Sequence, residues 1–239
     1  MSEQIYKQQS ELAKIINRYT DQNGIHTTAI SSLFFARRSN VDKPIYGVHN
    51  PSLCIVTQGM KQILLAEEHF KYGPTDYLLT SVNLPVTAQV IEASSDVPYL
   101  SLKLEFTPSQ ILEVLSKAEI PMGPKENMKR AMYVNQIDSS MLDAVIRLVR
   151  LLDNPKDIPI LASLFTKEIL YRVLQGPHGN TLKEMAIEGS YIYRVKDVIT
   201  HIMNNYNQSF RIEELAKIAN MGVSSLHRHF KEVTAMSPI

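Results

Sequence analysis

Hydrophobic and polar residues follow two different periods along the chain, and the period changes near residue 107. Upstream of that point, short runs rich in Val, Ile, Thr, Tyr and Phe are separated by Gly, Pro and Asn. In the last run, Leu100, Leu102 and Leu104 fall on one face and polar residues on the other. Many short strands with frequent turns predict a barrel or a sandwich. The predicted strands are Ile25–Ser31, Leu33–Arg38, Ile45–Val48, Leu53–Gln58, Lys61–Leu65, His69–Tyr72, Tyr77–Thr80, Thr87–Glu92 and Pro98–Phe106.

Helical patterns flank these strands on both sides. An amphipathic pattern opens the chain, and Thr107-Pro108 has the residues of a helix start, since Thr caps and Pro is tolerated in a first turn. One later helix carries an apolar stripe at three- and four-residue steps, formed by Leu142, Val145, Ile146, Val149 and Leu152. The stripe either packs on the strands or forms a dimer interface. The helices are expected at about Ser2–Tyr19, Thr107–Lys117, Ser139–Leu152, Ile158–Leu174, Asn180–Glu188 and Tyr191–Asn205.

The run Gln175-Gly176-Pro177-His178-Gly179 contains residues that end helices and mark linkers. We therefore predict two parts, residues 1–176 and residues 177–239. The fold class that follows is α+β, with a strand-rich N-terminal part and flanking helices, then an all-α segment.

The C-terminal part ends in the pattern of a helix-turn-helix. Small and apolar residues around Ala216 predict one short helix, and Val223, Leu226 and Phe230 predict the buried face of a second. Asn220 lies between them, and Asn is one of the few residues besides Gly that readily adopts positive φ at a helix end. The alternative is an ordinary pair of helices inside a helical bundle.

The outward face of the second helix carries hydrogen-bond donors rather than the Glu and Lys expected of a merely solvated helix. Hydroxyl, imidazole, guanidinium and ammonium groups are suited to phosphates and base edges in a major groove. We predict DNA contacts from Ser224, Ser225, His227, Arg228 and Lys231.

The run ELAKIANMGVSSLHRHFKEVTAMSP resembles the first helix-turn-helix of AraC/XylS-type regulators, with the family's pattern in Leu226, Arg228, Phe230, Lys231 and Ser237-Pro238. Upstream, NPSLCIVTQGMKQILL, FKYGPTDYLLTSVNLPV and VPYLSLKLEF are similar to the N-terminal domain of one branch of that family. The resemblance implies a cupin-like β-barrel that senses a small molecule or dimerises, joined to a DNA-binding domain.

Carried over by position, the resemblance assigns base contacts to Ser224, His227 and Arg228, and phosphate contacts to Ser225 and Lys231. Two positions depart from the family pattern: Asn220 replaces a turn glycine and Gly222 replaces a capping serine or threonine. The family has two helix-turn-helix units, and the sequence reaches Ile239 after the first. We therefore expect half the DNA-reading surface and weak binding to double-stranded DNA.

Composition narrows the function further. The net charge of +1 excludes a dedicated nucleic-acid coat, and the single cysteine, Cys54, excludes a disulfide framework. Neither a membrane span nor a signal peptide is found, so a cytoplasmic location is expected. An enzyme remains the alternative because cupin barrels also host metal enzymes. The strand region offers only the separated His26, His49 and His69, no Cys–His arrangement is evident, and Cys54 fits a buried small hydrophobe. No metal or cofactor is therefore expected.

The barrel's ligand is open at this point. Its walls would offer Tyr, Gln, Thr and Ser groups among aliphatic ones, which suits a small organic effector. Tyr46, Gln58 and Tyr99 are the candidate ligand contacts. A barrel that binds no ligand and only forms the expected homodimer is the remaining alternative.

Overall fold

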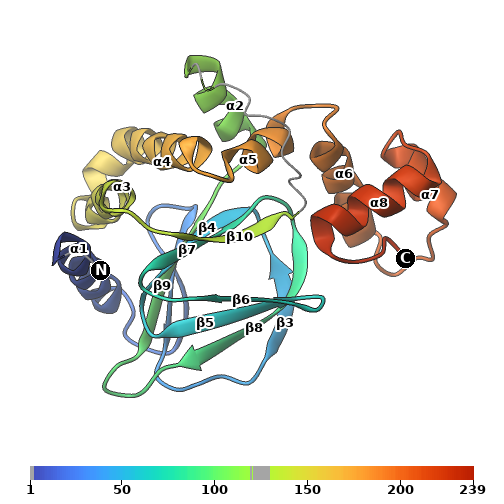
Figure 1. Ribbon diagram of the computed structural model, residues 1–239. Coiled ribbons are helices and arrows are strands. Elements are labelled where there is room, and N and C mark those ends of the chain that lie inside the picture. The colour runs from blue at the N-terminus through green and yellow to red at the C-terminus, as the bar shows by residue number, and fades with distance from the viewer. Residues whose placement is uncertain (1–2, 119, 121–129) are drawn as a thin grey trace.

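The computed structural model describes residues 3–118, 120 and 130–239. It is a mixed α+β structure in which two antiparallel sheets face each other and helices cover one side of the pair (Figure 1). The strands are β1 (Gly24–Thr27), β2 (Leu33–Arg38), β3 (Ile45–His49), β4 (Ser52–Gln58), β5 (Met60–Leu65), β6 (Glu68–Tyr72), β7 (Asp76–Thr80), β8 (Leu84–Glu92), β9 (Tyr99–Glu105) and β10 (Met132–Gln136). The α-helices are α1 (Glu3–Arg18), α2 (Pro108–Lys117), α3 (Ser139–Arg150), α4 (Ile158–Gln175), α5 (Gly179–Ala186), α6 (Tyr191–Asn204), α7 (Ile212–Ile218) and α8 (Val223–Thr234), with short 3-10 turns at Leu151–Asp153 and Pro155–Asp157.

The strands form two separate sheets rather than one closed barrel. Sheet A has the order β1-β2-β9-β4-β7-β10, and sheet B has the order β3-β8-β5-β6. The residues of the two sheets that point toward each other enclose an interior that includes the buried side chains of Val56, Ile63 and Leu65. We call this space the inter-sheet interior.

Three strand predictions needed correction. The predicted strand Ile25–Ser31 is shorter in the structure, because β1 (Gly24–Thr27) ends at Thr27. Strand β10 was not predicted, and it extends sheet A by pairing with β7 from Met132 opposite Thr80 to Gln136 opposite Asp76. Strand β8 begins at Leu84, three residues before the predicted start at Thr87. The added residues include Pro85, which cannot donate a hydrogen bond to a strand ladder. The proline is tolerated because this end of β8 pairs only with β3, and pairing with β5 begins at Thr87.

The apolar stripe of the third predicted helix, now α3, is buried. Leu142, Val145, Ile146, Val149 and Leu152 are between 0% and 6% exposed. The stripe therefore packs inside the protein, and the dimer-interface alternative for these residues is wrong.

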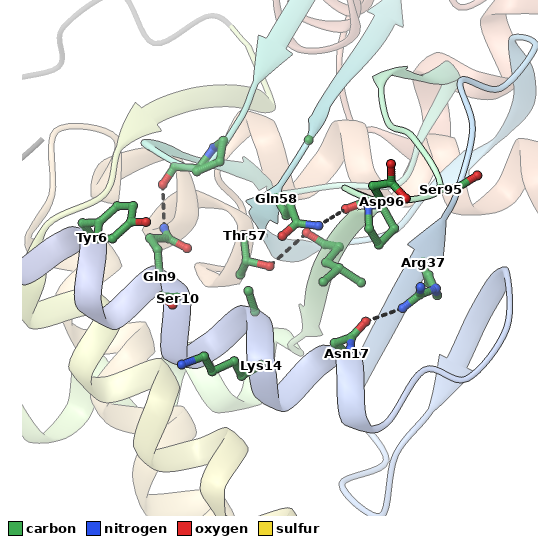
Figure 2. A pocket seen from close by; sticks show the side chains of 15 residues that line it. Tyr6, Gln9, Ser10, Lys14, Asn17, Arg37, Thr57, Gln58, Ser95 and Asp96 are labelled. Atoms are coloured by element: carbon green, nitrogen blue, oxygen red, sulfur yellow. Dashed lines mark hydrogen bonds between the residues drawn. The ribbon is translucent and has the colours of Figure 1, made fainter.

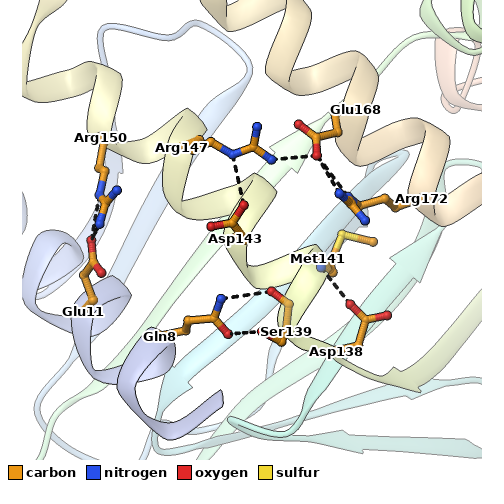
Figure 3. Close-up of polar contacts among 10 residues, drawn as sticks. All are labelled: Gln8, Glu11, Asp138, Ser139, Met141, Asp143, Arg147, Arg150, Glu168 and Arg172. Atoms are coloured by element: carbon orange, nitrogen blue, oxygen red, sulfur yellow. Dashed lines mark hydrogen bonds and ion pairs between the residues drawn. The ribbon is translucent and has the colours of Figure 1, made fainter. Parts of the chain in front are cut away.

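Polar contacts fix the helices that cover sheet A (Figure 3). The side chains of Gln8 on α1 and Ser139 on α3 are joined twice, through Gln8 Nε2 to the Ser139 carbonyl at 3.0 Å and Ser139 Oγ to Gln8 Oε1 at 2.9 Å. Arg150 pairs with Glu11 at 2.6 Å, and Arg147 pairs with Glu168 of α4 at 2.6 Å. These contacts tie α1, α3 and α4 into one layer. None of the helices described is long and apolar enough to cross a membrane.

Candidate nucleic-acid interface

Helices α7 and α8 are joined by a tight turn, at the place where the sequence predicts a helix-turn-helix. Asn220 has φ of 48°, as its position in the turn predicts, and it follows Ala219, the residue that caps the end of α7. The Met221 N–H donates to the Ala216 carbonyl at 3.0 Å, and Arg194 Nη1 of α6 donates to the Asn220 carbonyl at 2.8 Å. The turn is therefore fixed both by its own backbone and by the preceding helix.

A small buried core holds the two helices together. Leu215 and Leu226 are fully buried, and Phe230 is 6% exposed. Ala216 is 4% exposed at the point where α7 and α8 meet, where a small side chain permits close approach of the helices. The arrangement agrees with the buried face predicted from the sequence.

The predicted DNA contacts lie on the outer side of α8. Ser224, His227, Arg228 and Lys231 are exposed, and Ser225 is half-buried. Steps of three, one and three residues place the first four on one helical face. Gly222, the residue that caps α8, provides no side-chain hydrogen bond to the helix start. The first N–H groups of α8 therefore lack a side-chain cap, and such groups suit a phosphate oxygen.

His229 has a structural position instead. Its ring stacks on Tyr191 of α6 with centroids 4.9 Å apart, and its Nδ1 lies 3.1 Å from Glu232 Oε2. It therefore faces the rest of the helical unit, whereas His227 two residues earlier is exposed. Within the described residues, no group of three His, Cys, Asp or Glu side chains could hold a metal ion.

A contact that the sequence did not indicate joins the end of α8 to the sheets. The guanidinium of Arg130, two residues before β10, contacts the Glu68 carboxylate of β6 at 2.6 Å and donates to the carbonyls of Lys231 at 2.9 Å and Glu232 at 2.6 Å. The Ala131 N–H donates to the Val233 carbonyl at 3.0 Å. We call this set of contacts the Arg130 clamp.

The clamp satisfies carbonyl groups at the C-terminal end of α8, where helices leave them unpaired and where a cation is favourable. Its acidic partner, Glu68, is the first residue of β6. Arg130 and Glu68 are 62 residues apart. No local pattern signals a pair at such a separation, so the sequence could not have revealed the clamp.

The three candidate ligand residues lie in three different places. Tyr46 is 85% exposed on β3, at the edge of sheet B. Tyr99 is 2% exposed, and burial raises its pKa above the ordinary 10. Gln58 lines a groove of about 680 Å³ between α1 and the end of β4 (Figure 2).

The groove is polar and open. Lys14, Asn17 and Arg37 lie along one side of it, and Asp96 lies near the opposite end (Figure 2). Gln58 Nε2 donates to the Pro98 carbonyl at 2.7 Å, so the amide also holds the loop before β9.

The structure does bring one Cys–His pair together, contrary to the expectation from the sequence. Cys54 Sγ lies 3.7 Å from His49 Nε2 inside the inter-sheet interior. Burial raises the pKa of the Cys54 thiol, and burial together with Lys61 and Lys103 lowers the pKa of His49 to about 3. Both groups are therefore neutral near pH 7, and the pair lacks the thiolate that a nucleophile requires.

Residues 29–181 match the family described as AraC-type transcriptional regulator N-terminus. No curated protein matches the sequence.

Solved structures with a similar arrangement include an apo variant of ToxT from Vibrio cholerae strain SCE256, with 10% identity, 89% of this chain and 97% of that chain covered, and a TM-score of 0.43. ToxT from Vibrio cholerae O395 has 10% identity, coverage of 86% and 94%, and a TM-score of 0.40. The AraC-like transcriptional activator CuxR has 9% identity, coverage of 96% and 85%, and a TM-score of 0.35. This degree of likeness is too low to carry details of site or ligand to this chain.

Proposed function

Because the chain belongs to the family of AraC-type transcriptional regulators, we propose that it binds DNA through the exposed face of α8 and responds to a small molecule held by its two sheets. The family consists of transcriptional regulators, so the chain is not an enzyme. The observation that carries the DNA-binding proposal is the face of α8 itself: Ser224, His227, Arg228 and Lys231 are all exposed on a helix whose other side is packed.

The proposed roles follow from chemistry and position. Arg228 is long enough to reach base edges and can pair bidentately with guanine, and Ser224 and His227 lie beside it on the same face. Lys231 and the half-buried Ser225 are suited to phosphates, which fix position without reading sequence.

The test is binding of the purified chain to a library of DNA duplexes, followed by fluorescence anisotropy on the selected sequence at several salt concentrations. We expect affinity to fall steeply with salt, and Arg228→Ala to weaken binding by about 1–3 kcal/mol and to relax the preference at one base position. Lys231→Ala should weaken all duplexes alike. Lys7→Ala, which removes a 72%-exposed cation from α1, is the control and should change neither. Equal affinity for all duplexes in the unaltered chain and in Arg228→Ala would sink the reading-helix proposal.

We also propose that the chain forms a homodimer, through the outer side of α4. Ile160 is 70% exposed, Leu164 is 53% exposed and Tyr171 is 39% exposed. Positions 160, 164 and 171 fall on one stripe of a helix. A helix with apolar residues on both sides is usually covered on both sides. One side of α4 contacts α3, and we propose that a second copy of the chain covers the other.

A further inference from the structure

Three cationic side chains of the described residues interact across the inter-sheet interior, and two of them are paired with carboxylates. Arg38 of β2 pairs with Asp42 at 3.0 Å, and Lys103 of β9 pairs with Glu105 at 2.7 Å. Lys61 of β5 interacts electrostatically with Arg38, Asp42 and Lys103. Lys61 therefore lies across the interior from sheet A. Among the residues that the structure describes, Lys61 makes no hydrogen bond and no ion pair. The Lys61 side chain is half-buried, and no carboxylate pairs with its ammonium group within the described part of the chain.

The other groups around Lys61 cannot supply that charge. Burial raises the pKa values of Cys54, Tyr72 and Tyr99, so their thiol and phenol groups stay protonated and neutral. The pKa of His49 falls to about 3, so its imidazole is neutral as well. Burial and the neighbouring cations also lower the pKa of Lys61, which is the response of an ammonium group that lacks a partner.

Tyr72 adds a second unpaired donor at the same place. It lies directly opposite Lys61 in the β5–β6 pairing and is 1% exposed. Its hydroxyl is buried and has no hydrogen-bond partner in the described part of the chain. Buried polar groups are nearly always paired, so an unpaired hydroxyl beside an unpaired ammonium indicates that a further group belongs between them.

We propose, on the premise that the sheets hold the effector, that the inter-sheet interior binds a small organic monocarboxylate through Lys61 and Tyr72. One negative charge balances Lys61, and the two carboxylate oxygens accept one hydrogen bond each from the ammonium and the hydroxyl. The walls beside these donors are aliphatic and include Ile63, Val86 and Val90, which suit a short hydrocarbon body.

The polar side of the interior provides the way in. The side chains of Lys103 and Arg38 are 32% and 24% exposed, and those of Asp42 and Glu105 are 26% and 29% exposed. A carboxylate that approaches from solvent therefore passes charged groups before it reaches Lys61, and the excess positive charge favours its entry.

The test is isothermal titration calorimetry of the full chain with butyrate and benzoate, each compared with its neutral amide, butyramide and benzamide. We expect saturable binding of a carboxylate and affinity for its amide that is at least about tenfold lower, because the amide lacks the charge that Lys61 requires. Lys61→Met should abolish binding. Tyr72→Phe, which keeps the ring and removes only the hydroxyl, should weaken binding several-fold and covers the case in which Lys61→Met does not fold.

Two lysine variants serve as controls. Lys71→Met changes an exposed side chain next to Tyr72, and Lys14→Met changes the groove beside α1; neither should alter carboxylate binding. The proposal is overturned if neither carboxylate binds, if the amides bind equally well, if chloride or phosphate competes on equal terms, or if Lys14→Met rather than Lys61→Met removes binding. DNA binding is measured separately, without carboxylate. If the chain binds DNA but no carboxylate, the carboxylate site is wrong and the proposed DNA-binding function is unaffected. If it binds carboxylate but no DNA, the DNA-binding proposal is wrong and the carboxylate site is unaffected.

Discussion

The burial of His49 makes the stability of the folded chain depend on pH. Burial first, and then Lys61 and Lys103, lower the pKa of His49 from 6.5 to about 3. The unfolded chain therefore takes up a proton near pH 6.5 that the folded chain takes up only near pH 3. As the pH falls between these values, the free energy of unfolding falls by about 1.4 kcal/mol per pH unit from this group alone.

We expect His49→Gln, which cannot titrate, to reduce that slope. The measurement is the free energy of unfolding in urea between about pH 4 and pH 7. Carboxylates add a slope of the same sign, so the informative quantity is the difference between variant and unaltered chain. His69→Gln, at an exposed position on β6, is the control. Identical slopes for His49→Gln and the unaltered chain would contradict the burial argument.

Ala216 has a small side chain that lets helices α7 and α8 pack closely. It is 4% exposed where α7 meets α8, and its carbonyl accepts the Met221 N–H of the turn. Ala216→Leu should destabilise the unit by about 1–3 kcal/mol, because the larger side chain forces the helices apart. Thermal unfolding followed by circular dichroism checks this, with Lys217→Leu as the control that adds the same side chain at an exposed position. An Ala216→Leu variant as stable as the control would mean that the helices do not pack closely there.

At the scale of elements, the Arg130 clamp decides how α8 is held against the sheets. Its guanidinium bridges β6 and the last turn of α8, and its side chain is only 29% exposed. We expect Arg130→Met to free the C-terminal turn of α8. Amide hydrogen exchange in the last turn should then become about 10-fold faster, while α7 and the start of α8 change little.

The matched control for the clamp is Arg150→Met. Arg150 forms a comparable ion pair with Glu11 at 2.6 Å, in the helical layer away from α8. If both variants alter exchange in α8 to the same degree, the effect is a general loss of stability rather than release of the clamp. Glu68→Gln should give part of the Arg130→Met effect, since it leaves the carbonyl contacts in place.

Most helices and strands could be predicted because the sequence pattern that specifies each of them lies within that segment. The alternation in Tyr99–Glu105, the Thr107 cap and the positive φ of Asn220 are all encoded within a few residues. Strand β10 escaped prediction because it is short and its residues become a strand only by pairing with β7. The two-sheet arrangement likewise depends on pairings between distant segments rather than on any one segment.

The candidate sites divide along the same line. The outer face of α8 could be read from a single helical period, and Ser224, His227, Arg228 and Lys231 are exposed as that period implies. The polar residues of the inter-sheet interior come from strands β2, β3, β4, β5, β6 and β9, so Lys61 and Tyr72 had no signal that singled them out. The lack of a partner for Lys61 and Tyr72 can be recognised only when the residues around them in the folded chain are known.

At the scale of the whole molecule, a series of contacts connects sheet B to the end of helix α8. Tyr72 and Glu68 belong to the same strand, β6, and Glu68 holds Arg130, which holds the end of α8. A ligand beside Tyr72 would therefore lie on the strand that carries the clamp. A coupling between the proposed effector and DNA sites would require one element with two arrangements that both ligands bias, and β6 with the Arg130 clamp is the candidate for that element.

The proposed dimer would extend this series to a second copy of the chain through the outer side of α4. We expect Leu164→Glu to shift the chain from dimer to monomer, since a carboxylate in an apolar interface is left without a partner. Sedimentation velocity measures the shift, with Ser163→Glu as the control at a neighbouring exposed position outside the stripe. A monomer should keep its affinity for one half-site but lose the gain that two tethered reading helices provide on a duplex with two half-sites. If Leu164→Glu remains dimeric, α4 is not the interface. If it becomes monomeric without losing the two-site gain, the dimer exists but does not position the reading helices.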